Sequence, residues 1–260
     1  MSIVIKVKNY KSTHFWHQIM GEFMPVVSII AKEKPQKVYL VNSRRSWKAP
    51  FDKFYLELGV EIIFRNKINS LEKLPTFTYK SWEYGWDQNS YKKCMLAVEY
   101  LKSLIQPNIL KEDRILVQYR DSNKELEEYF HRNFSGIKKT YGTNRRFFKD
   151  MKKINTIIPE TEYIFADNEP LLSQIRPYLN KDKLIIEHGA GMFFVFFMKE
   201  NSKIIEILTP EKFKTKQNAD QSLRRICKNR NNILERVVVP NKGSIMLKKD
   251  EIIRKSKMFY

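Results

Sequence analysis

The residues best suited to chemistry lie in one stretch, where a strand-like run ends in a turn of small residues. Residues 184–186 are continuously apolar, Gly189, Ala190 and Gly191 follow, and Glu206 stands near the end of the next apolar run. Ligands bind at the carboxyl ends of parallel strands, and small residues there let a ligand approach the backbone. The start of a following helix suits a diphosphate, with Glu206 accepting hydrogen bonds from ribose hydroxyls. A tight turn without a ligand is the alternative interpretation.

This turn belongs to an alternation of strand and helix patterns along the chain. In the first half, strand patterns cover residues 3–7, 38–41 and 60–64, helical patterns cover 14–31, 51–58 and 91–105, and 66–90 is irregular. In the second half, strand patterns cover 114–118, 163–166, 184–186, 203–208 and 236–239, with helical patterns near 123–133, 144–153, 169–180 and 191–199. Such alternation, with continuously apolar strands, predicts an α/β fold with parallel sheets covered by helices on both faces.

The chain divides into two halves at the Gln-Pro-Asn sequence of residues 106–108. We expect an N-terminal α/β domain over residues 1–107, on the side of the acceptor substrate. A Rossmann-like, nucleotide-binding domain is expected over residues 108–240. Residues 241–260 are expected to be helical and to pack back toward the N-terminal domain.

The composition is strongly basic. The 260 residues include 48 Lys and Arg against 29 Asp and Glu, a formal net charge of +19. This charge favours anionic partners such as nucleotides, although scattered lysines also fit a solvated surface. The two cysteines, Cys94 and Cys227, lie far apart and form no CxxC pattern, so neither a disulfide framework nor a zinc site is predicted.

No segment has the pattern of a membrane anchor. The N-terminal residues lack the apolar core of a signal peptide, and the longest apolar run, residues 192–198, is too short to cross a bilayer. We therefore expect a soluble, cytoplasmic protein that makes at most peripheral contact with an anionic membrane. The Lys-, Ile- and Asn-rich composition suits a bacterium, or a large DNA virus acting in the host cytoplasm.

Residues 184–208 resemble the signature of family-61 glycosyltransferases. In that signature a strand runs into His-Gly-Ala-Gly, an apolar helix follows, and a second strand closes on Ile-Glu; here these are residues 184–191 and 203–207. Weaker similarities fall in the same order at residues 114–120, 171–175 and 14–25. The chain departs from the family at Phe193 and Phe194, where a polar pair is usual, and at residues 199–202, where a Pro-Gly turn is usual.

The resemblance implies a GT-B fold, in which two Rossmann-like domains face a central cleft. It also implies an inverting sugar transfer from a nucleotide sugar without a bound metal or other cofactor. A UDP-sugar is the expected donor, with UDP-xylose tried first, and a glycan or glycoprotein hydroxyl is the expected acceptor.

Several residues are candidates for donor binding under this resemblance. Arg120, Arg145 and Arg146 would neutralise the diphosphate, because guanidinium groups bind phosphate bidentately and stay charged. His188 would contact the donor at the turn, together with Gly189, Ala190, Gly191 and Glu206. Surface positions for the arginines, and a bracing role for His188, are the structural alternatives.

An inverting transfer needs a general base that takes the proton of the acceptor hydroxyl. In a GT-B cleft this base usually comes from the N-terminal half, where His17 and Asp87 are the leading candidates and Glu22 follows. His17 matches the histidine of the family's N-terminal helix, and Asp87 ends an aromatic stretch, residues 82–87, of a kind that binds sugars. Structural roles are the alternative for each.

Two other functions remain open. The basic charge, with Arg224, Arg225 and residues 228–232, would suit a nucleic-acid-binding protein. No recognised nucleic-acid motif is present, and we expect no stable nucleic-acid partner. A non-catalytic protein with a glycosyltransferase-like fold is the second alternative, to which Phe193 and Phe194 point.

Overall fold

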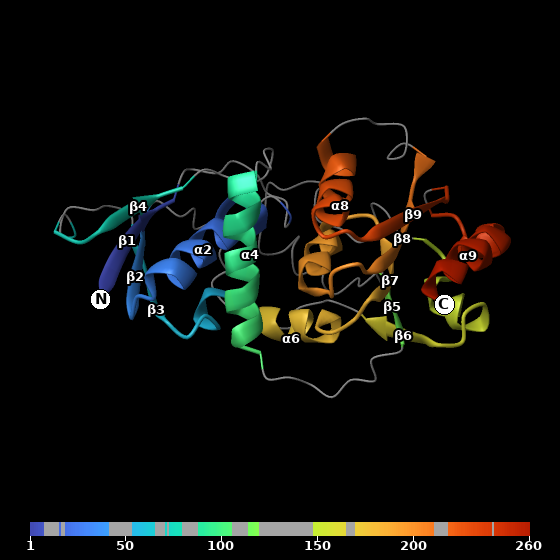
Figure 1. Cartoon of the computed structure of the whole chain (residues 1–260), viewed down its shortest axis with the longest axis horizontal. Coiled ribbons are helices and arrows are strands. Elements are labelled where there is room, and N and C mark those ends of the chain that lie inside the picture. The colour runs from blue at the N-terminus through green and yellow to red at the C-terminus, as the bar shows by residue number, and fades with distance from the viewer. Residues whose placement is uncertain are drawn as a thin grey trace, which may run out of the picture. The chain divides into compact units, whose positions relative to one another are not determined.

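The chain forms two compact units, whose elements are labelled in Figure 1. Unit 1 comprises Met1–Pro107 and Asn168–Arg176, and unit 2 comprises Asn108–Asp167 and Pro177–Tyr260. The computed structural model describes residues 1–7, 16, 19–41, 54–65, 71, 73–79, 88–105, 114–119, 148–164, 170–210, 218–240 and 242–260.

Unit 1 is built on a four-stranded parallel sheet. Its strands are β1 (Ser2–Lys6), β2 (Lys37–Val41), β3 (Glu61–Arg65) and β4 (Thr76–Thr78), in the order β3-β2-β1-β4. The first three match the predicted strands. The fourth lies in the stretch predicted to be irregular, because three partly exposed residues, Thr-Phe-Thr, carry no apolar run to signal a strand.

The helices of unit 1 cover this sheet. The predicted helix over residues 14–31 is described as a π-helical turn, η1 (Ile19–Phe23), followed by α2 (Met24–Glu33). Pro25 lies in the first turn of α2, where a backbone amide would have no partner within the helix, so its absence in proline costs nothing. Lys34 ends the helix in the left-handed conformation. The long α4 (Gln88–Ser103) packs against α2 (Figure 1).

Unit 2 is built on a five-stranded sheet in which every neighbouring pair is parallel. Its strands are β5 (Ile115–Gln118), β6 (Thr161–Ile164), β7 (Lys183–Glu187), β8 (Lys203–Leu208) and β9 (Ile233–Val238), in the order β6-β5-β7-β8-β9. The predicted α/β class with parallel sheets is therefore confirmed. The order is that of an open doubly wound sheet, compatible with a Rossmann-like fold.

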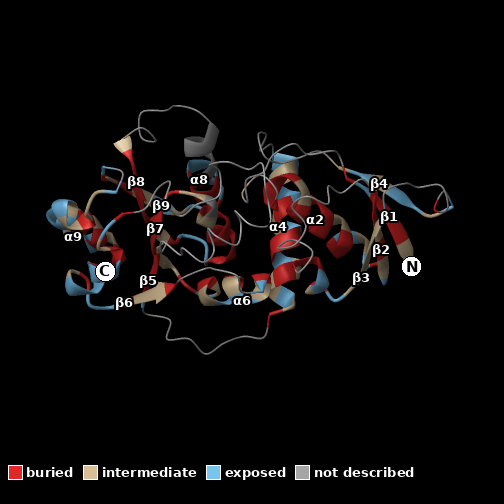
Figure 2. Cartoon of the chain, turned by 180° about the vertical axis from the view of Figure 1, so that it is seen from behind, coloured by how far each residue is buried: buried red, intermediate tan, exposed pale blue. Residues whose placement is uncertain are grey.

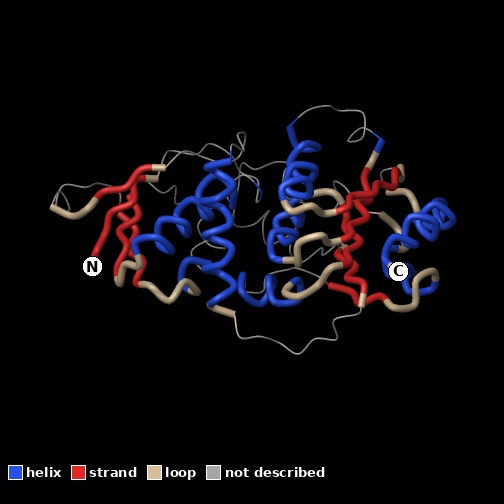
Figure 3. Tube along the Cα trace, viewed as in Figure 1, coloured by secondary structure: helices blue, strands red, loops and turns tan. Residues whose placement is uncertain are grey.

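Side-chain alternation gives the sheet of unit 2 two different faces. One face carries Ile185, Ile205 and Val237, which share a core with η4 (Met151–Thr156) and the C-terminal helix α9 (Lys249–Ser256). The other face lies toward η6 (Ala190–Phe197) and α8 (Asn218–Asn229), as Figures 1 and 3 show. Helices cover both faces, so the central strands β7 and β8 are almost wholly buried (Figure 2).

The C-terminal segment packs in unit 2, which corrects the expectation that it returns to the N-terminal domain. It forms η7 (Ile245–Lys248), α9 and η8 (Lys257–Phe259). Ile245, Ile252 and Phe259 recur every seven residues, so they line one side of the segment and enter the core of unit 2.

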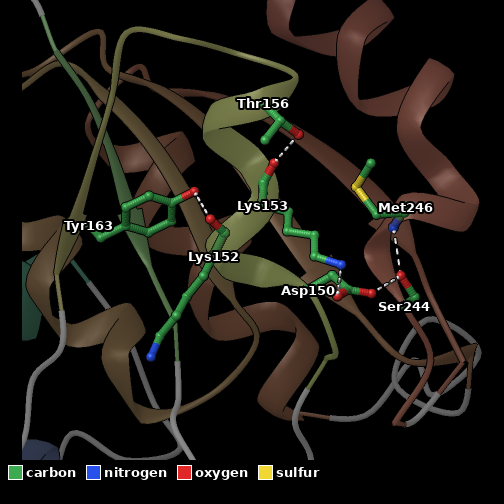
Figure 4. Close-up of polar contacts among 7 residues, drawn as sticks. All are labelled: Asp150, Lys152, Lys153, Thr156, Tyr163, Ser244 and Met246. Carbon is green, nitrogen blue, oxygen red and sulfur yellow. Dashed lines mark hydrogen bonds and ion pairs between the residues drawn. The ribbon is translucent and has the colours of Figure 1, made fainter.

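A polar cluster also holds this segment to unit 2 (Figure 4). The Ser244 hydroxyl donates to Asp150 Oδ2 at 2.5 Å and accepts from the Met246 amide at 3.1 Å, which caps η7. Lys153 pairs with the other oxygen of Asp150 at 2.9 Å. The Ser244 hydrogen bond, followed by Lys153, lowers the pKa of Asp150, so this carboxylate stays charged while it caps the segment.

Residues 168–176 belong to unit 1, although the sequence pattern predicted them in the C-terminal domain. They contain α6 (Leu171–Ile175), which continues into η5 (Arg176–Tyr178). The Glu57 carboxylate accepts from the amides of Leu171 at 2.7 Å and Leu172 at 2.8 Å. A side chain more than a hundred residues earlier thus caps this helix, a contact that local sequence patterns do not reveal.

Across the described residues, no helix has the length and apolarity needed to cross a bilayer.

Candidate functional site

The candidate site in unit 2 starts from a row of aligned residues that crosses its sheet. The pairing register places Gln118 of β5 beside Ile186 of β7, Ile186 beside Glu206 of β8, and Glu206 beside Arg236 of β9. Register partners in a parallel sheet point to the same face, so these four side chains share one face. His188, two residues beyond Ile186, extends that face past the end of β7.

Three of these residues form a buried polar network. His188 Nδ1 lies 2.6 Å from Glu206 Oε1, and Arg236 Nε lies 2.8 Å from Glu206 Oε2. Glu206 has no exposed surface, and His188 and Arg236 are only 5% and 9% exposed. Buried charges need partners, and here the two oxygens of one carboxylate face a ring nitrogen and a guanidinium group.

This geometry gives Glu206 protein partners that the sequence pattern did not predict. The sequence pattern predicted a carboxylate that accepts hydrogen bonds from ribose hydroxyls. The structure places it inside the sheet, two residues before the end of β8, where Oε1 contacts His188 and Oε2 forms an ion pair with Arg236 that lacks hydrogen-bond geometry. Glu206 is therefore a residue that positions His188, and His188 is the member of the pair that reaches the strand end.

The turn after β7 needs glycine at position 189 for its backbone, and it brings Gly191 against the end of a side chain. Gly189 has φ 156° and ψ −155°, a region that is essentially restricted to glycine. At Gly191, an added Cβ would lie 2.1 Å from Nε2 of Gln118. The His188 amide still donates to the Ile207 carbonyl at 2.8 Å, so the strand ladder fixes His188 up to the start of the turn.

The segment after the turn, η6, is a short 3₁₀ helix whose aromatic side chains pack in the core. Phe193 and Phe194 are buried, and the Phe194 ring stacks on Tyr178 with centroids 4.8 Å apart. Arg230 Nη2 donates to the Met198 carbonyl at 2.6 Å, beyond the last turn. The departure from the family's polar pair thus has a structural reason, because both phenylalanines fill the core beneath η6.

A thiol also lies near the network. Burial, followed by the charge of Glu206, raises the pKa of Cys227 to about 12. The thiolate is the reactive form of cysteine, so a thiol held protonated is chemically inert at neutral pH. Cys227 is therefore a packing residue of α8.

The site lies where the strand order of the sheet reverses. The chain passes from β5 to β6 on one side and then returns to β7 on the other side of β5. In open α/β sheets, ligands bind outside the carboxyl ends of the strands at such a switch point. Gln118 ends β5, and His188 and the glycines follow β7, so these residues lie at the expected position.

Among the predicted donor-binding residues, the structure brings His188, Gly189 and Gly191 together with Glu206. Ala190 begins η6, and its side chain is outside the described residues. Arg120, Arg145 and Arg146 also lie outside the described residues.

Two residues of the site were missed by the sequence analysis. Gln118 was noted only as part of a strand, and Arg236 only as the start of the next predicted strand. Their signal was a polar residue at the end of an apolar run, after Ile-Leu-Val for Gln118 and before Val-Val-Val for Arg236, a position that needs a partner when it is buried.

Of the predicted base candidates, only Glu22 lies in the described residues; His17 and Asp87 lie outside them. Glu22 is half-buried in η1, a π-helical turn of a kind that is frequent at functional sites. The Tyr55 hydroxyl donates to Glu22 Oε1 at 3.3 Å. Tyr79 directly follows β4. Burial, followed by the charge of Glu22, raises the pKa of the Tyr79 hydroxyl.

Within the described residues, no three His, Cys, Asp or Glu side chains gather as metal ligands would. Comparison of the chain with protein-family models found no match, and comparison with curated proteins found none. The fold and the site define an α/β protein with a candidate ligand site at the switch point of its second sheet.

Proposed function

We propose that this chain is an inverting, metal-independent glycosyltransferase of the GT-B type. It transfers the sugar of a UDP-sugar, with UDP-xylose the first to be tried, to a hydroxyl group of a glycan or glycoprotein. The observation that supports this most is the position of the His188–Gly191 turn, at the carboxyl end of β7 and beside Gln118 at the end of β5. Nucleotides bind at this place in doubly wound sheets.

Two further features support the proposal. Each unit contains a parallel sheet of the kind that a GT-B enzyme uses in its two domains. The switch point of the sheet of unit 1 falls between β1 and β4, and the chain segments that carry His17 and Asp87 directly follow these strands in the sequence. The resemblance of residues 184–208 to family-61 glycosyltransferases points the same way.

The proposed reaction needs two things from the protein. A general base in unit 1 takes the proton of the acceptor hydroxyl as its oxygen attacks the anomeric carbon of the donor. The bond from that carbon to the diphosphate breaks, and UDP leaves with the electron pair. The arginines Arg120, Arg145 and Arg146, and the amides that follow Gly189, are the proposed groups that stabilise the departing negative charge.

A thermal-shift screen with a panel of nucleotide sugars tests this function. A ligand at one hundred times its dissociation constant stabilises the fold by about 2.7 kcal/mol, which raises the melting temperature measurably. We expect UDP-sugars to raise it and matched ADP-, GDP- and CMP-sugars to raise it less. Slow release of UDP from the stabilising donor would then identify an enzyme.

The same protein and nucleotide sugars, together with random oligonucleotides, test the two alternative functions. Arg224, Arg225 and Lys228 are exposed on α8, which favours contact with an anionic polymer. Salt-sensitive binding to random oligonucleotides, without stabilisation by any nucleotide sugar, would replace the proposal with a nucleic-acid-binding function. Stabilisation by a UDP-sugar without any hydrolysis or transfer would instead indicate a non-catalytic protein with this fold.

A further inference from the structure

The two ring nitrogens of His188 have different surroundings. Nδ1 lies 2.6 Å from Glu206 Oε1. In the part of the chain that the structure describes, no hydrogen bond reaches the other nitrogen, Nε2. His188 also keeps a small exposed surface, whereas Glu206 has none. The ring therefore joins an enclosed carboxylate to the strand end at which a ligand would bind.

The Glu206 carboxylate determines which nitrogen carries the hydrogen. An ionised carboxylate is only an acceptor, and Arg236 pairs with its second oxygen at 2.8 Å. Nδ1 must therefore be the donor, which leaves Nε2 of a neutral imidazole as an acceptor.

We propose that Nε2 of His188 accepts a hydrogen bond from a ribose hydroxyl, so that the site selects ribonucleotides over deoxyribonucleotides. This inference rests on the proposed function, in which a UDP-sugar binds at the ends of β5 and β7. Phosphate oxygens at neutral pH are acceptors and cannot satisfy Nε2, whereas a ribose hydroxyl can donate to it.

The chain order at the turn favours ribose over the base as the donor of this bond. The amides of residues 190 and 191, which follow Gly189, are the proposed diphosphate contacts, and His188 comes immediately before this glycine. Ribose is joined directly to one end of the diphosphate and the transferred sugar to the other end, and UDP itself carries ribose alone. A nucleotide whose diphosphate lies at the start of η6 therefore presents its ribose first to the neighbouring side chain.

Discrimination between the two sugars should be substantial. A deoxyribonucleotide would leave the Nε2 acceptor without the partner that the ribose hydroxyl supplies, which costs about tenfold in affinity. Glu206 acts in this scheme as a positioning residue, because it touches the imidazole ring and not the nucleotide. Arg236 positions Glu206 in turn.

The variant Glu206→Gln tests the scheme sharply because Arg236 determines how the new amide is oriented. Arg236 can only donate, so it turns the oxygen of the substituted side chain toward itself and leaves the amide NH₂ group facing His188. Nδ1 must then accept, and the hydrogen moves to Nε2. The substitution preserves the shape of the site but reverses the polarity that the ligand meets.

The experiment combines two measurements on the whole chain. Nitrogen-15 NMR of the histidine side chains reports the tautomer of His188, assigned by its loss in His188→Phe. Titration calorimetry gives the affinities of UDP, 2′-deoxy-UDP and 3′-deoxy-UDP. Glu187→Gln is the matched control. It makes the same carboxylate-to-amide change at the residue that precedes His188 in the chain, whose side chain points to the opposite face of the sheet.

We expect the wild type and Glu187→Gln to carry the hydrogen on Nδ1 and to prefer UDP to one deoxy analogue by about tenfold. Glu206→Gln should carry it on Nε2, so that the ribose hydroxyl accepts instead of donating, and His188→Phe should lose the preference for UDP. Equal affinities for UDP and both analogues, or a wild-type hydrogen on Nε2, would overturn this inference and leave the proposed function standing. A wild type that binds no nucleotide at all would overturn both.

Discussion

The Tyr260 hydroxyl donates a hydrogen bond of 2.6 Å to Glu160 Oε2, although a hundred residues separate them in the chain. This bond lowers the pKa of Glu160 from its usual 4.5 and raises that of Tyr260 from its usual 10.0. It joins the last residue to the turn before β6, so it closes the C-terminal segment over unit 2.

The bond predicts a stability contribution confined to a pH window. A carboxyl with a lowered pKa contributes stability above its unfolded value and loses it as the pH falls through the lower folded value. A hydroxyl with a raised pKa contributes below its unfolded value and loses it as the pH rises through the higher folded value. Tyr260→Phe should therefore be less stable than the wild type between about pH 5 and 10, and the difference should shrink on both sides. Urea unfolding across about pH 3–11 measures it, and a pH-independent difference would contradict the assignment.

The contact between Gly191 and Gln118 predicts a repairable defect. Gly191→Ala places a methyl group where Gln118 Nε2 lies. Because that atom ends a flexible side chain that can shift, we expect a loss at the low end of the overpacking range, about 1 kcal/mol. The double variant Gly191→Ala/Gln118→Ala should recover most of the loss, with Gln118→Ala alone as the control. Denaturant unfolding of the four proteins gives the coupling energy. Additive effects would mean that another contact makes glycine necessary.

The cap on α6 predicts a graded series at Glu57. Glu57→Ala removes both acceptors from the amides of Leu171 and Leu172, and should destabilise unit 1 by about 0.5–2 kcal/mol. Glu57→Gln keeps one acceptor oxygen and should lose less. Hydrogen exchange of those two amides would increase in the same order. Unchanged exchange in Glu57→Ala would show that the cap does not hold the helix.

The proposed chemistry predicts that the base lies in unit 1. The test compares three variants: His17→Ala, Asp87→Ala and Glu22→Gln. We expect one of them to reduce turnover by about 10²–10⁴-fold while UDP affinity stays unchanged. The acidic limb of the rate profile should lie near about pH 4 for a carboxylate and nearer about 6.5 for a histidine. Loss of turnover together with UDP affinity would indicate a damaged fold. Normal turnover in all three would place the base elsewhere.

The proposed mechanism also predicts resistance to chelators. Turnover should be the same after dialysis against EDTA, because side chains and backbone amides are proposed to neutralise the leaving diphosphate. The control is a second dialysis followed by addition of Mg²⁺ or Mn²⁺. Activity that disappears with EDTA and returns with Mn²⁺ would refute the metal-independent mechanism and count against the GT-B proposal.

Sequence patterns predicted the parts of this fold that depend on neighbours in the chain. The strands around Ile185 and Ile205 are continuously apolar because helices bury both faces, and that pattern is visible in one sequence. The partnership of Glu206 with Arg236 is not visible, because it depends on the register between β8 and β9. The ribose role was predicted for Glu206 without knowledge of these contacts, because periodicity gives the strand but not the residue that faces its carboxylate.

The assignment of Asn168–Arg176 to unit 1 has a consequence for how the protein is made. The chain leaves unit 1 after Pro107, returns at Asn168 and leaves again after Arg176, so no single cut separates the two units. Domains generally fold as units while the ribosome is still adding residues. Here the first unit lacks α6 until the stretch Asn108–Asp167 of the second has emerged. Synthesis from the N-terminus therefore completes the first unit only at Arg176, after part of the second has been made. A fragment that ends at Pro107 leaves Glu57 without the helix that it caps.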